Sequence, residues 1–153
     1  MKWISKGFLS YFPLFIVVPF LTQCGVNTST PVITQSGDFA LLALSNTPRF
    51  DFGFKAVGTQ TEQAFTVSNI GKLAASAMDG SFYLSVSYSF KDGTYPGTGG
   101  SCGTTLASGA SCTIIVVFSP TNPGVAEAPV TITYHNGSAT TSVGTLTLSG
   151  TGL

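Results

Sequence analysis

The chain has 153 residues, of which 43% are hydrophobic and 8% are charged, and its formal net charge is zero. A neutral chain offers no basic surface to a phosphate backbone, so the composition argues against a nucleic-acid partner. The length fits one domain with an additional terminal segment, and the apolar and aromatic content can fill a core, so the low charge does not indicate disorder.

The amino terminus has the pattern of an export signal. Lys2 and Lys6 give it a positive charge, and residues 7–21 form an uncharged, mostly apolar run that ends abruptly in polar sequence. The run is short for a bilayer-spanning helix, which needs about 20 apolar residues, and Pro13 and Pro19 would weaken a helix further. We therefore predict a cleaved signal segment.

Residues 21–24 (LTQC) resemble the lipobox of bacterial lipoproteins, in which the cysteine thiol is acylated and becomes the first residue after cleavage. Gln23 departs from the Gly, Ala or Ser of most lipoboxes, although spirochaete lipoboxes are looser there. The resemblance implies a signal peptide over residues 1–23, a lipid on Cys24, and membrane attachment in the bacterial cell envelope, at the outer membrane or cell surface. An ordinary secretory signal cut near the same place is the alternative.

The cysteine count agrees with this interpretation. Three cysteines are an odd number for an exported protein, and acylation of Cys24 would leave Cys102 and Cys112 as a pair. An oxidising compartment allows that pair to form a disulfide, which would close an 11-residue ring. Zinc held by Cys102, Cys112 and His135 is a less favoured alternative.

Residues 24–37 are polar, contain a proline and show no sustained period, which predicts a flexible tether. Residues 38–153 form the expected folded domain. Short runs of β-branched and aromatic residues recur there between turn residues, the pattern of an antiparallel β-sandwich or barrel, and no window has a capped helical period. The expected strands cover residues 39–44, 49–57, 63–69, 73–78, 82–90, 113–118, 128–134 and 140–148.

Alternation within these runs suggests which side chains face the core. The run 49–57 alternates three phenylalanines with other residues, as a half-buried strand does. The run 82–90 alternates only partly, because Tyr83 and Tyr88 fall on opposite faces. Asn136-Gly137 predicts a tight hairpin between the last two runs, since both residue types tolerate positive φ.

The strand at 113–118 is apolar on both faces, which is typical of a strand buried on both sides. Its second face carries Ile115 and Val117, and a long glycine-rich loop with Tyr95 precedes it. Exposed loops and faces held by a rigid sandwich commonly carry recognition, so these three residues are the candidate partner-binding surface. The favoured alternative for Ile115 and Val117 is that they lie under the amino-terminal strand.

Several motifs in order resemble the bacterial Ig-like domains called choice-of-anchor D, which are related to Hydin and abnormal-spindle (ASH) sandwiches. The resemblance covers about residues 48–153 and implies an immunoglobulin-like sandwich of about seven strands, usually on surface or exported proteins, without catalytic residues. The cysteine pair matches the paired cysteines of the family. The motifs are residues 50–53 (FDFG), 57–58 (VG), 66–71 (TVSNIG), 109–120 (GASCTIIVVFSP), 123–124 (PG) and 148–152 (LSGTG).

No pattern predicts catalysis, a metal or a cofactor. His135 is the only histidine and lies beside a turn signal, and the carboxylates are scattered. Asn69 is expected to tie the backbone of its turn. The sequence therefore predicts a non-enzymatic, envelope-anchored Ig-like lipoprotein that acts through protein or cell-surface contact or as a structural spacer. A glycan-binding module is the alternative.

Overall fold

A computed structural model describes residues 38–83, 85–142 and 146–153. The predicted signal peptide, the lipidation site at Cys24 and the tether lie outside these residues. Within the described part of the chain, no helix is long and apolar enough to cross a bilayer.

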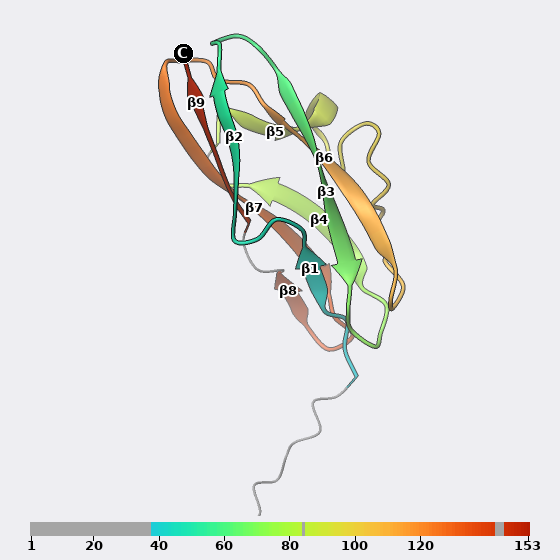
Figure 1. Cartoon of the computed structure of the whole chain (residues 1–153). Coiled ribbons are helices and arrows are strands. Elements are labelled where there is room, and N and C mark those ends of the chain that lie inside the picture. Colours follow the sequence, from blue (N-terminus) through green and yellow to red (C-terminus); the bar gives the residue numbers. More distant parts are fainter. Residues whose placement is uncertain (1–37, 84, 143–145) are drawn as a thin grey trace, which may run out of the picture. The chain divides into compact units, whose positions relative to one another are not determined.

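The described residues form two packed β-sheets (Figure 1), as the sequence predicts. One sheet has the order β1-β3-β6-β5, and the other has the order β2-β9-β7-β4, with β8 paired to β7. All pairs are antiparallel except β2 with β9, which run parallel. The strands are β1 (Leu42–Leu44), β2 (Arg49–Lys55), β3 (Thr61–Asn69), β4 (Ser76–Phe82), β5 (Tyr88–Phe90), β6 (Ser111–Phe118), β7 (Gly124–His135), β8 (Thr140–Ser142) and β9 (Leu146–Gly152), and a 3-10 turn covers Lys91–Gly93.

Aromatic side chains join the two sheets across the core. The Phe65 ring of β3 meets the Phe50 ring of β2 edge-on at 5.1 Å between centroids. The Phe118 ring of β6 lies 5.4 Å from that of Phe52 on β2. Offset and edge-on aromatic pairs add stability beyond the area they bury, so these contacts fix how the sheets face each other.

All eight expected strands differ from the observed ones at one end or both, and three of them differ in more than their ends. The run 82–90 is not one strand, because the chain leaves the second sheet after Phe82 and enters the first sheet at Tyr88. The run 140–148 is divided into β8 and β9. Only residues 76–78 of the weak run 73–78 belong to a strand, β4, which continues to Phe82. The ambiguous alternation around Tyr83 and Tyr88 therefore reflects a change of sheet.

The sandwich has two ends, which we name after a residue at each. At the Leu153 end, the Val57 N–H donates to the Leu153 carbonyl and the Gly58 N–H donates to Pro120. At the Asn69 end, the Ala40 N–H donates to the Asn136 carbonyl, beside the turn between β7 and β8. That turn spans residues 136–139 and is longer than the predicted two-residue hairpin.

Buried Asn69 organises the Asn69 end, as the sequence predicts. Its Oδ1 accepts from the N–H groups of Leu41 and Gly71, at 3.2 and 3.0 Å. Its Nδ2 donates to the carbonyls of Leu73 and Leu106, at 2.8 and 3.0 Å. One fully buried side chain therefore holds four backbone groups from three segments.

Candidate functional site

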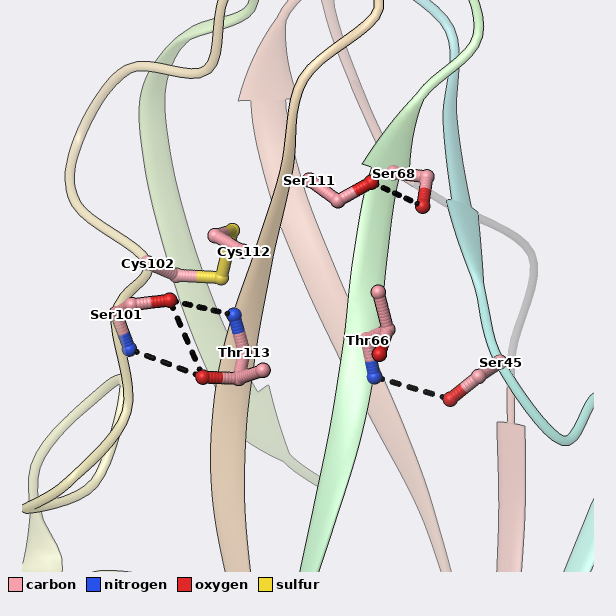
Figure 2. Close-up of a disulfide and its surroundings, with 8 residues drawn as sticks. All are labelled: Ser45, Thr66, Ser68, Ser101, Cys102, Ser111, Cys112 and Thr113. Carbon is pink, nitrogen blue, oxygen red and sulfur yellow. Dashed lines mark hydrogen bonds between the residues drawn. A yellow bond between two sulfur atoms is a disulfide. The ribbon is translucent and has the colours of Figure 1, made fainter.

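The predicted Cys102–Cys112 disulfide is present, and both cysteines are buried. Figure 2 shows that the loop beside it is also held by hydrogen bonds between Ser101 and Thr113. The Thr113 carbonyl accepts from the N–H groups of Ser101 and Cys102, at 2.9 and 3.1 Å. The long loop is therefore fastened along the edge of β6.

Tyr95 points into the sandwich instead of presenting a binding surface. Its ring packs edge-on against Phe90 at 5.5 Å, and a Cβ placed on Gly80 would lie 2.6 Å from it. The hydroxyl is buried without a hydrogen-bond partner among the described residues. Burial, with a smaller contribution from Asp79, raises the pKa of Tyr95 to about 12. The expected role in partner binding has no support in this geometry.

Ile115 and Val117 also offer little free surface. Val117 is 6% exposed, and Ile115 is partly covered where the loop turns at Gly97. The favoured explanation for their burial is wrong in one respect: β1 pairs beside β3 and does not cover β6. The Ile115 N–H donates to the Pro96 carbonyl at 2.8 Å, so the loop after β5 runs along this part of β6.

The exposed apolar surface lies elsewhere, and it begins at a bulge in β2. Asp51 pairs with Ser149 of β9, but the next matched pair is Phe54 with Thr151, so β2 has one extra residue. Gly53 has a φ of +72°, which L side chains rarely adopt, and its N–H donates to Asp51 Oδ1. A bulge redirects the following side chain. Phe50 and Phe52 pack against the core, whereas Phe54 is 72% exposed.

Phe54 belongs to a row across three strands, in which the two outer residues are exposed and the middle one, Thr151, is half-buried. Thr151 of β9 is the partner of Phe54 in the parallel pair and of Val125 in the antiparallel pair with β7. Paired residues project from the same face of a sheet, and neighbouring strands are about 4.8 Å apart. Val125 is 73% exposed. We call Phe54, Thr151 and Val125 the apolar row; it lies near the Leu153 end.

A groove of about 330 Å³ adjoins the apolar row at Val125. Its walls come from two segments, Ser85–Ser87 between β4 and β5, and Thr121–Glu127 at the start of β7. Val86 is 83% exposed at its rim. The other lining side chains are mostly hydroxyl or amide groups, and the lining carboxylate of Glu127 forms an ion pair with Arg49.

The described residues contain no cluster of metal-binding side chains, and the one histidine has a local role. Among residues 38–83, 85–142 and 146–153, no three His, Cys, Asp or Glu side chains gather to hold a metal. The Nδ1 of His135 accepts from the Gly137 N–H at 3.2 Å within its turn, so this histidine supports local structure.

Solved structures with the same fold include a bacterial protease, a domain of a human protein and a bacterial protein of unknown function. The chain is similar to the VesB protease of Vibrio cholerae, with 18% identity over 72% of this chain and 31% of VesB and a TM-score of 0.57. It is also similar to an ASH/PapD-like domain of human CEP192, with 15% identity over 73% of this chain and 84% of that domain and a TM-score of 0.52. A protein of unknown function from Porphyromonas gingivalis matches with 13% identity over 71% of this chain and 46% of its own length and a TM-score of 0.51.

The chain thus spans less than a third of the length of VesB. A search of curated protein sequences finds no match. These structural likenesses establish the fold, which is an immunoglobulin-like sandwich. The profile of HYDIN/CFA65/VesB-like Ig-like domains matches residues 42–151, and the chain belongs to this family. The predicted relation to Hydin-type domains is confirmed, while the choice-of-anchor D assignment stays a prediction.

Proposed function

We propose that this protein is a non-enzymatic interaction module that is held at the bacterial envelope by a lipid on Cys24. The observation that supports it best is the apolar row, because a bulge at Gly53 turns a phenylalanine out of the core. Single exposed apolar residues are ordinary, but Phe54 and Val125 project from the same face on either side of Thr151, and Val125 borders a groove, a grouping found at protein-binding surfaces.

The apolar row has the features of a small recognition site. Phe54 and Val125 are exposed on rigid strands, so little conformational entropy is lost when a partner covers them. An aromatic anchor with a polar surround resembles the energetic centre of protein interfaces. The Arg49–Glu127 ion pair lies on the side of the row away from the Leu153 end and can orient a partner, although an exposed pair contributes little to affinity.

The interaction is tested by photo-crosslinking in the cells that produce the protein. A photoreactive amino acid at position 54 is expected to form a covalent adduct with a defined protein. The same label at position 70 is the control, because Ile70 is 65% exposed but lies at the Asn69 end. Phe54→Ser and Val125→Ser should each weaken capture of that protein at least about tenfold, as expected for a central contact, and Ile70→Ser should not. Equal adducts from both positions would contradict the proposal.

The lipid anchor is tested separately. Labelling with a fatty-acid analogue should mark the native protein and not the Cys24→Ser variant, and the variant should leave the membrane fraction. Mass spectrometry of the native protein should find Cys24 acylated as the first residue. An unmodified Cys24 in mature protein would support the ordinary secretory signal instead.

Glycan binding is the second candidate, and the exposed Phe54 ring favours it. Sugar sites commonly combine an aromatic face with hydroxyl and amide groups, which the groove also offers. A glycan array with the folded domain distinguishes the two functions: a hit that Phe54→Ser abolishes would favour glycan binding over a protein partner.

A further inference from the structure

One half of β7 lacks a neighbour on one side. β9 pairs with β7 from Gly124 to Val130, and β4 pairs with the opposite side of β7 from Val130 to His135. β4 ends at Phe82, where the chain crosses to the other sheet (Figure 1). The side of β7 that faces away from β9 between Gly124 and Pro129 has no paired strand among the described residues; we call it the open edge.

The ladder geometry shows which backbone groups point to the open edge. The Thr147 N–H donates to the Pro48 carbonyl at 2.9 Å, so Thr147 directs its hydrogen bonds toward β2. Its partner on β7, Pro129, must then face away from β9, and the direction alternates along an antiparallel ladder. Glu127 and Val125 therefore direct their N–H and C=O groups toward the open edge, whereas Ala126 and Ala128 bond to β9.

The two outer edges of the same sheet, on β4 and β2, are covered or interrupted. The free side of β4 is covered where the Met78 N–H donates to Thr104 and Ala75 pairs with Leu106. The free side of β2 carries the bulge, where Asp51 binds the Gly53 N–H. Such features prevent unwanted strand pairing. The open edge has no comparable cover among the described residues.

The groove beside the open edge is preformed. Its opposite wall, Ser85–Ser87, is fixed because Ser85 Oγ accepts from the Tyr88 N–H at 2.9 Å and the Ser87 carbonyl accepts from the Ser119 N–H at 2.8 Å. This wall and the edge of β7 line the same groove, so a single extended segment fits there more readily than the edge of a second folded sheet. At about 3.4 Å per residue, Val125 to Ala128 accommodates roughly four residues.

The lining also limits the chemistry of the occupant. Val86 and Val125 are the exposed apolar side chains at the rim, and the remaining groups are mostly hydroxyl and amide. The carboxylate of Glu127 is paired with Arg49, so the groove offers no unpaired charge from its described lining. These features fit an uncharged segment rich in β-branched residues, which favour the extended conformation.

We infer that the open edge of β7 is a strand-addition site, where an uncharged, β-branched segment of a partner protein pairs with Val125 and Glu127 inside the groove. Main-chain hydrogen bonds supply affinity in this mode, and side-chain contacts beside the strand supply specificity. The inference rests on the proposed interaction function and names the form of the partner.

Amide hydrogen exchange of the free domain tests the open edge itself. Val125 and Glu127 should exchange at least about tenfold faster than Ala126 and Ala128, because only the latter are bonded to β9. Uniform protection along Gly124–Ala128 would overturn the inference. Exchange that slows with increasing protein concentration would overturn it as well, because a second copy would then be the occupant.

A synthetic peptide, acetyl-Thr-Val-Thr-Val-Thr-amide, tests strand addition by NMR titration. The amides of Val125 and Glu127 should shift most and become protected, and a peptide N-methylated at alternate residues should lose this effect. Val125→Pro removes one donor at an edge that tolerates proline, and it should weaken binding at least about fivefold relative to Val125→Thr, which keeps the donor. Absence of shifts at millimolar peptide, or equal binding by the two variants, would overturn strand addition.

The same variants separate this inference from the proposed function. If Phe54→Ser abolishes capture of the crosslinked partner but Val125→Pro behaves like Val125→Thr, the interaction module stands and strand addition is wrong. If Phe54→Ser and Val125→Ser both leave capture unchanged, the proposed function is wrong.

Discussion

Removal of the Asn69 side chain should be among the most damaging single changes in the domain. In Asn69→Ala the N–H groups of Leu41 and Gly71 and the carbonyl of Leu73 lose their partner, while the Leu106 carbonyl keeps the Ala75 N–H. At about 1 kcal/mol for each of the three backbone groups left without a partner, the free energy of unfolding should fall by about 3 kcal/mol. For a domain of this size the melting temperature should fall by about 10–15 °C.

Asn69→Asp sharpens this prediction through its pH dependence. The aspartate keeps the acceptor for Leu41 and Gly71 but places a carboxylate against the carbonyls of Leu73 and Leu106. Burial and these carbonyls should raise the pKa of the new carboxyl in the folded state above its value in the unfolded chain. The folded state then binds more protons, so stability is highest below the unfolded pKa, about 3.9, and falls as the pH rises through the folded pKa.

Thermal melts followed by circular dichroism at pH 4 and pH 7 provide the measurement. Asn122→Ala is the matched control, because Asn122 is exposed and bonds only to Thr121 among the described side chains; it should change stability by less than about 0.5 kcal/mol. A melting temperature of Asn69→Ala within about 2 °C of the control corresponds to well under 1 kcal/mol. That result would refute the predicted contribution of the Asn69 hydrogen bonds to stability. An Asn69→Asp deficit that does not grow from pH 4 to pH 7 would refute the electrostatic part.

Three further changes test other parts of the structure. Reduction of the Cys102–Cys112 bridge should lower the free energy of unfolding by about 3 kcal/mol in a denaturant titration, because it frees an 11-residue ring; an unchanged midpoint with both thiols free would contradict this. Gly150→Ala should destabilise by about 1–3 kcal/mol, since its Cβ would lie 2.5 Å from Phe118 Cε1; a melt equal to that of the parent would show that the ring moves easily. Tyr95→Phe should leave neutral-pH stability equal or higher, because the lost hydroxyl has no described partner. Burial raises the pKa of the Tyr95 hydroxyl to about 12 in the folded protein, compared with 10.0 for an exposed tyrosine. The folded state therefore holds this proton more tightly, and the parent protein loses stability as the pH rises from 10 to 12. Alkaline melts should therefore favour the variant, and a variant that is equally sensitive to alkali would argue against burial of the hydroxyl.

Local sequence determines the features that were predicted correctly. The β6 strand follows from an uninterrupted apolar run, and the disulfide follows from two cysteines that flank a short loop. Asn69 could be assigned to its turn because Asn-Ile-Gly closes a strand with residues that favour turns. Each of these predictions depends on residues that are close in the sequence.

The candidate site depends on register between distant strands, which the sequence does not show. The alternation of Phe50, Phe52 and Phe54 suggests one face, but the bulge at Gly53 reverses the last residue. The glycine within the strand was the available signal, since glycine in a strand pattern often marks a bulge. The groove arises because β4 ends opposite Val130, and no local pattern fixes where β4 stops along β7.

The apolar row lies at the level of the start of β7, which determines its distance from the point where the chain enters the domain. The chain enters the sandwich at Ala40, which bonds beside the far end of the same 12-residue strand. At about 3.4 Å per residue, the row therefore stands some 35–40 Å from the point of entry. Phe54 and Val125 are therefore separated from the residue at which the chain enters the domain by nearly the whole length of β7.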